Sequence, residues 1–119
     1  MRSIAAFLLS AGALVVAAAP AAASTSMVKP TTLSIIVGTH GVAGGPKKFT
    51  VKKGAHVVLV VRSAIGKQVH LHGYDIEKPI RGKTIPVRMP FVAGVTGVFE
   101  IELHLTESRG LRIGLLTVK

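Results

Sequence analysis

From Thr32 to the C-terminus, short runs of apolar and β-branched residues are separated by glycine, proline and lysine at short intervals. This spacing is typical of an all-β sandwich, in which brief strands alternate with turns. No stretch beyond the N-terminal segment shows helical periodicity. The pattern predicts a Greek-key β-sandwich of seven or eight strands, with the main strands at 32–37, 49–52, 57–61, 69–75, 85–91, 98–105 and 111–118.

Alternation within the runs indicates how individual strands lie in the sandwich. The run 57–61 is almost continuously apolar, which predicts a central strand covered on both faces. Pro86 and Pro90 predict that 85–91 is an edge strand, because proline has no N–H to donate to a neighbouring strand. In 98–105, a period of two places three apolar residues on one face and three polar residues on the other: Phe99, Ile101 and Leu103 against Glu100, Glu102 and His104.

The N-terminal segment, residues 1–23, has the parts of a secretory signal peptide: a positive charge at Arg2, an apolar stretch over 4–19 and small residues before the cleavage point. A retained membrane anchor is the alternative, but the stretch is shorter than the ~20 apolar residues that a transmembrane helix needs. We therefore expect cleavage, a short polar lead (24–30) and one sandwich domain (31–119). This domain would be periplasmic or secreted, and not membrane-spanning after cleavage.

The chain of 119 residues contains no cysteine and has a formal net charge of +10. Small exported domains often depend on disulfides, so this one must be held together by apolar packing. Nucleic acid is not an expected partner, because we expect export and because Tyr74 and four phenylalanines, one of them (Phe7) in the signal peptide, make no stacking platform for bases. The basic surface is either simply solvated or attracts an acidic envelope protein or another anionic surface.

Three histidines are the candidate metal ligands. His70 and His72 lie two apart on an expected strand, so both imidazoles project to one face, and this spacing can chelate a metal. His104, at the end of a later strand, is the third candidate, and Met89 is a more remote one. The alternative is that His72 is a buried, hydrogen-bonded histidine at the end of the sandwich, with His70 and His104 on the surface.

Several segments together resemble the cupredoxin family, most closely the small periplasmic cupredoxin-like domains with a His-x-His-Gly-Tyr-Asp segment and a downstream Glu-Leu-His. The resemblance extends from about Leu33 to Val118 and implies a Greek-key β-sandwich. The segments that carry it are 49–54, 69–74, 97–103 and the closing leucine-rich strand.

The resemblance also implies that most of the family's copper ligands are missing. His72 matches the family's first histidine, but Leu103 occupies the position of its cysteine. Residues 105–107 hold no second histidine, and Leu111 or Ile113 replaces the axial methionine. Because a blue-copper centre needs a thiolate, type I electron transfer is excluded.

We therefore expect an exported cupredoxin-like binding protein that binds or delivers copper, or another divalent metal, through His72, His70 and His104. Glu100 and Glu102 either add carboxylate ligands or form solvated cross-strand pairs. The alternative is a metal-free structural or interaction module whose basic surface docks an anionic partner. No nucleophilic serine motif or phosphate-binding loop is present, so we do not expect an enzyme.

Overall fold

The computed structural model describes residues 10–20 and 27–119. Residues 10–20 are exposed and have no regular secondary structure; the rest of the predicted signal peptide lies outside the described residues. Within the described ranges, no helix is long and apolar enough to cross a membrane. The chain forms eight strands: β1 (Thr31–Val37), β2 (Lys47–Val51), β3 (His56–Ser63), β4 (Gln68–Leu71), β5 (Ile76–Pro79), β6 (Val87–Val92), β7 (Gly97–His104) and β8 (Gly110–Val118).

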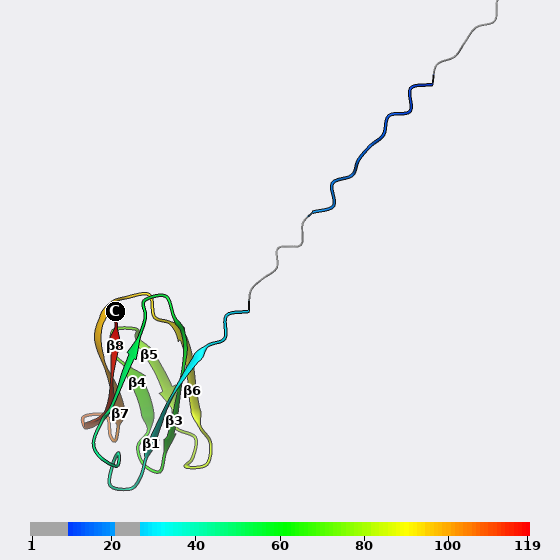
Figure 1. The fold of residues 1–119 in the computed structure, drawn as a ribbon. Coiled ribbons are helices and arrows are strands. Elements are labelled where there is room, and N and C mark those ends of the chain that lie inside the picture. The colour runs from blue at the N-terminus through cyan, green and yellow to red at the C-terminus, as the bar shows by residue number, and fades with distance from the viewer. Residues whose placement is uncertain (1–9, 21–26) are drawn as a thin grey trace, which may run out of the picture.

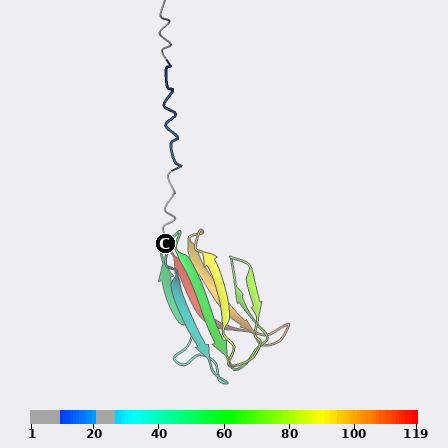
Figure 2. The same cartoon turned by 90° about the vertical axis from the view of Figure 1, so that its right-hand side faces the viewer.

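The strands form two sheets that pack face to face (Figures 1 and 2). The order is β1-β3-β6 in the three-stranded sheet and β2-β8-β7-β4-β5 in the five-stranded sheet. The pairs β1–β3 and β2–β8 are parallel, and the other neighbours are antiparallel. The predicted all-β Greek-key sandwich is confirmed.

The core lies between the two sheets and follows from alternation along each strand. Val57, Leu59 and Val61 of β3 point inward, as do Val69 and Leu71 of β4, and all are 1% exposed or less. Fully burying an aliphatic side chain contributes about 1.5–3 kcal/mol, so this interior can stabilise a domain that has no cysteine. The other buried apolar residues are Leu33, Ile35, Val37, Val51, Val87, Met89, Ala93, Ile101, Leu103, Ile113, Leu116 and Val118.

The structure corrects the predicted strand 69–75, which is two strands joined by a turn. β4 ends at Leu71, the turn covers residues 72–75, and β5 follows. Gly73 and Asp75 both have positive φ, at 83° and 51°, and aspartate is among the residues that tolerate this conformation best. A Cβ at Gly73 would overlap the ring of Phe99 at Cδ1, so the turn also needs glycine for space.

The positions of two other strands are largely as expected. β6 is an edge strand, as its prolines predicted. β3 is central in its sheet, but the prediction that both of its faces are covered was wrong: Val58 and Val60 are only partly buried. A sandwich has two layers, so the outer face of each sheet lies against solvent.

A β-bulge in the five-stranded sheet determines which residues of β8 face outward. Ile101 pairs with Gly114, whereas the next residue, Glu102, pairs with Arg112, so Ile113 is the extra residue. Ile113 and Gly114 are both buried although they are consecutive. The bulge therefore places Arg112 beside the acidic residues on the outer face of β7.

Candidate metal site

Two neighbouring strands bring the three histidines to the outer face of the five-stranded sheet. In β4, Val69 and Leu71 point into the core, so His70 points outward. His72 is the first residue of the turn after β4, and its backbone N–H donates a hydrogen bond to the carbonyl oxygen of Glu100 in β7. In β7, Leu103 points inward and His104 outward. The antiparallel register pairs His70 with Glu102 and Gln68 with His104, so outward-facing residues of the two strands become neighbours.

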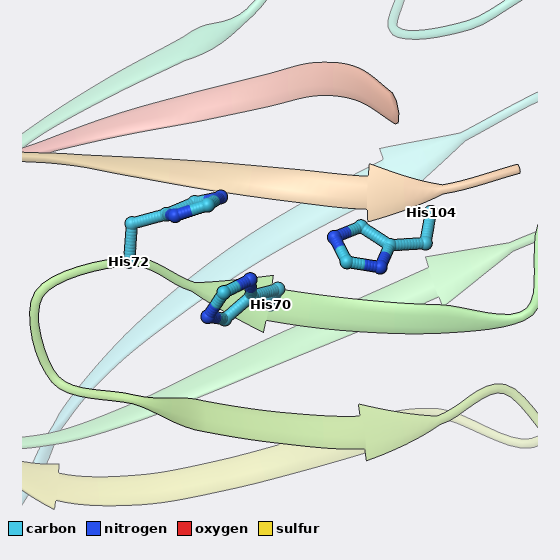
Figure 3. A group of neighbouring side chains, drawn as sticks. All are labelled: His70, His72 and His104. Carbon is cyan, nitrogen blue, oxygen red and sulfur yellow. The ribbon is translucent and has the colours of Figure 1, made fainter. Parts of the chain in front are cut away.

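The imidazole rings converge on one another. The ring centroids of His70 and His72 are 3.9 Å apart, and those of His70 and His104 are 5.5 Å apart. One ring nitrogen from each of the three histidines lies within 4.8 Å of the others. Figure 3 shows the rings of His72 and His104 pointing toward each other, with His70 beside them.

Glu102 adds a carboxylate to the same cluster. Its Oε1 is 2.8 Å from Nε2 of His104, and its Oε2 is 3.7 Å from Nε2 of His72. The carboxylate therefore lies between two of the candidate ligands. It can act as a fourth metal ligand with little movement of its side chain.

Gly110 of β8 provides the space that this carboxylate occupies. A Cβ at Gly110 would lie 2.5 Å from both Cδ and Oε1 of Glu102. Gly110 is not one of the glycines with positive φ, so its backbone conformation does not require glycine. It is the position of Glu102 that requires the absence of a side chain here.

Two of the ring nitrogens lack a hydrogen-bond partner among the described residues. They are Nδ1 of His70 and Nε2 of His72, and both are buried. The nearest carboxylate oxygens, on Glu77 and Glu102, are 3.4 and 3.7 Å away, within ion-pair distance but without hydrogen-bond geometry. Buried polar atoms normally have partners, so such nitrogens in a cluster are suited to bind an ion.

The surroundings hold His104 in place. The Gln68 side-chain amide donates a hydrogen bond to Nδ1 of His104 at 3.1 Å, which leaves Nε2 facing the cluster. A ligand histidine is commonly oriented by a partner on its other nitrogen. Gln68 fills this role once its amide is turned to present oxygen to a protonated Nδ1.

Glu100 and Arg112 form a charged pair at the edge of the cluster. Arg112 Nη2 donates a hydrogen bond to Oε2 of Glu100 at 2.7 Å. This hydrogen bond, together with the guanidinium charge, holds the pKa of Glu100 below its usual value. The same hydrogen bond raises the pKa of Arg112.

The local charge is opposite to that of the whole chain. The protein has 15 lysines and arginines but only five acidic residues, and three of these five, Glu77, Glu100 and Glu102, have a carboxylate within 4.8 Å of a nitrogen of His70 or His72. Carboxylates gathered around imidazole rings favour a cation.

The observed spacing fits a bound ion after small rotations. A Zn–N bond of ~2.0–2.1 Å places two nitrogens of a tetrahedral site about 3.4 Å apart, somewhat closer than the 4.8 Å limit that contains the three ring nitrogens. The side chain of His72 is 43% exposed, so it has room to turn. Imidazole and carboxylate together form a donor set that suits Cu(II) and Zn(II).

The three predicted ligands therefore lie together, and the alternative description differs from the structure at His72. His72 is half-exposed on the sheet face and is not a buried histidine at the end of the sandwich. Leu103 is completely buried and faces away from the histidines. Met89 is wrong as a candidate, because it is buried in the core side of β6 in the opposite sheet.

Sequence reasoning missed Gln68, Glu77, Gly110 and Arg112. These four residues belong to three strands, β4, β5 and β8, whose register could not be known before β5 and the bulge were seen. The other two histidines behave as expected, since His40 and His56 are exposed away from the cluster.

No family model matches the chain, and no curated protein matches it. Among solved structures, it is similar to the solution NMR structure of a copper-binding protein in the apo form, with a TM-score of 0.52 and 16% identity over 76% of this chain and 91% of the other. It is also similar to a chain of a heme-copper terminal oxidase dimer, with a TM-score of 0.48 and 15% identity over 75% of this chain. The match covers 65% of that oxidase chain, less than two thirds of its length. The first likeness supports the cupredoxin-like fold.

Proposed function

We propose that this chain is an exported binding protein that holds a copper ion, or a similar divalent metal, on the outer face of its five-stranded sheet. The observation that carries the proposal is the convergence of His70, His72 and His104, with one ring nitrogen from each within 4.8 Å of the others. We infer that the protein binds or delivers the metal and is not an enzyme.

The ligand chemistry favours Cu(II), with Zn(II) next. Imidazole suits both metals, and divalent copper binds most strongly among the first-row ions. His70, His72 and His104 supply the imidazoles, and Glu102 supplies a carboxylate 2.8 Å from His104. The buried nitrogens of His70 and His72 that lack partners among the described residues gain one when an ion binds.

The position of the cluster favours reversible binding. It lies on an open sheet face, so an ion can enter and leave, or pass to another protein, without opening of the core. Fast electron transfer needs a thiolate ligand, and the chain has no cysteine. A solved structure with a similar fold is that of a copper-binding protein, and we take it as a precedent for copper on this fold.

Calorimetry and electron paramagnetic resonance of the purified protein titrated with Cu(II) test the proposal. We expect one stoichiometric site with nitrogen coupling, and a loss of affinity of about 100-fold or more in His72→Ala, since a direct ligand should matter more than the outer partners whose loss costs 10–100-fold. The matched control is His56→Ala, an exposed histidine on β3 of the other sheet. Equal loss in both variants, or no binding by the unaltered protein, would overturn the proposal.

A second candidate function is a metal-free module that docks an anionic partner. A cavity of about 260 Å³ between β5 and β6 is lined by Lys78, Arg81 and Arg88 and by no acidic residue. If copper fails to bind, the expected result is binding to vesicles of anionic lipid or to an acidic protein. This binding should weaken with salt and in the double variant Lys78→Glu, Arg88→Glu.

A further inference from the structure

The outer face of the five-stranded sheet holds a second group of potential ligands that overlaps the histidine cluster. His72, Glu100 and Glu102 each offer one ligand atom, and these three atoms lie within 4.8 Å of one another. The group shares His72 with the three-histidine set. It differs by having two carboxylates in place of two imidazoles.

The two groups differ in the metals that they suit. Imidazole suits copper and zinc, whereas carboxylate oxygens suit harder ions such as Mn²⁺, Mg²⁺ and Ca²⁺. One face of the sheet thus offers a nitrogen-rich set through His70 and His104 and an oxygen-rich set through Glu100. Which set an ion uses depends on whether Glu100 is free to bind it.

Arg112 controls the availability of Glu100. Its Nη2 is 2.7 Å from Oε2 of Glu100, and a hydrogen bond between two charged groups is among the stronger ones. The bulge at Ile113 places Arg112 opposite Glu102, next to both carboxylates of the oxygen-rich set. Its positive charge also repels a cation from these carboxylates but lies away from His70, which is one strand further along the sheet.

We propose that His72, Glu100 and Glu102 form a second, oxygen-rich site for a hard divalent cation such as Mn²⁺, and that Arg112 suppresses this site by binding Glu100. Arg112 is thus a residue that determines metal specificity. The inference rests on the proposed function in sharing His72 and the Glu102 carboxylate. It adds that the preference for copper depends on a residue that is not itself a ligand.

The test compares Mn²⁺ and Cu²⁺ binding in the unaltered protein and in Arg112→Met. Mn²⁺ binding is measured by the loss of the free-ion signal in electron paramagnetic resonance, and Cu²⁺ binding by calorimetry. Removing an exposed pair of opposite charges changes a free energy by up to about 1 kcal/mol, which corresponds to about fivefold in an equilibrium constant. We expect Mn²⁺ affinity to rise about fivefold while Cu²⁺ affinity changes by less than about twofold.

Two matched variants separate the pairing of Glu100 from a general effect of charge. Arg109→Met removes one positive charge from the neighbouring β7–β8 loop, where Arg109 lines a hollow with Glu102 and His104, and it should leave the ratio of the two affinities unchanged. The double variant Arg112→Met, Glu100→Gln should lose the gain in Mn²⁺ affinity, because the released ligand is gone. Cu²⁺ binding should persist in Glu100→Gln, since the three-histidine set does not use Glu100.

The outcomes distinguish this inference from the proposed function. If Cu²⁺ binds through His72 but Arg112→Met leaves the ratio unchanged, the inference fails and the proposed function stands. If Arg112→Met and Arg109→Met raise Mn²⁺ affinity equally, or if the gain survives Glu100→Gln, Arg112 acts through charge alone and the inference also fails. If Cu²⁺ does not bind but Arg112→Met gains Mn²⁺ affinity through Glu100, the proposed function fails and the second site stands.

Discussion

The two outer faces of the sandwich differ greatly, although the two inner faces are alike. Inside, both sheets contribute aliphatic side chains such as Leu59 and Leu71, which are 1% exposed or less. Outside, the three-stranded sheet carries apolar residues such as Ile36 and Val92, exposed by 69% and 49%, whereas the five-stranded sheet carries the histidines and glutamates. Packing constrains the inner residues strongly and the outer residues weakly, so the outer face is where this fold can vary its chemistry.

The largest effect should come from disturbing the inner face beneath the site. Leu103→Ala removes a completely buried side chain next to His104, and such changes cost about 2–5 kcal/mol of unfolding free energy. Urea denaturation measures this cost. Val98→Ala in the same strand is the control, because Val98 is 65% exposed and should change stability by less than about 0.5 kcal/mol.

The same variant tests whether the two faces act independently. Folded Leu103→Ala protein should still bind one copper ion, because its histidines come from the opposite face of β7, from β4 and from the turn that follows β4. Loss of copper binding by protein that is still folded would show that the inner face also shapes the site.

The sequence predicted the inner faces of the two sheets well, because side chains along a strand point alternately inward and outward. Alternation in β7 placed Ile101 and Leu103 inward and His104 outward, and the structure agrees. The prediction failed where backbone conformation broke the period. The turn with positive φ at Gly73 and Asp75 divided one expected strand into β4 and β5, because local turn geometry prevailed over the apolar pattern.

The site could be predicted only in part, for a related reason. The spacing of His70 and His72 places both rings on one face from sequence alone, and His104 was a candidate from its strand. The neighbours of these rings depend on register between strands. The pairing of His70 with Glu77 needs β5, and the position of Arg112 needs the bulge at Ile113, neither of which has a clear signal in the sequence.

A smaller effect should follow from a change that affects only the outer face. Gly110→Ala places a Cβ where the Glu102 carboxylate now lies, 2.5 Å from two of its atoms, so Glu102 must move away from His104. Losing even an outer partner of a ligand typically lowers metal affinity 10–100-fold, so displacing a carboxylate that can itself bind the ion should cost at least as much. We expect this loss for Cu(II) in calorimetry, with little change in the unfolding transition.

Gly94→Ala is the matched control for this substitution. Gly94 does not have positive φ, and a Cβ there would meet nothing within 4 Å. Copper affinity should remain that of the unaltered protein. If Gly110→Ala also kept full affinity, Glu102 would have no part in binding the metal.

The smallest effect concerns the charged pair at the edge of the site and its dependence on pH. Arg112 holds the pKa of Glu100 below the ordinary value of 4.5. Because the pKa of Glu100 is lowered in the folded state, the pair contributes its full stabilisation at a pH above the ordinary pKa. This stabilisation is lost as the pH falls through the lower pKa of the folded state. Both side chains are substantially exposed, at 53% and 29%, so the contribution is small and is screened by salt.

Urea denaturation of Arg112→Met at neutral and at acidic pH measures this dependence. Its free energy of unfolding should lie slightly below that of the unaltered protein at neutral pH, and the difference should vanish in acid or in high salt. The control comes from the other sheet: Arg88 has no acidic partner among the described residues, so Arg88→Met should show no difference that depends on pH. A larger pH dependence of the unfolding free energy in Arg88→Met would contradict this expectation. The acidic residues would then not distinguish the outer face of the five-stranded sheet electrostatically, and only its histidines would set it apart from the other outer face.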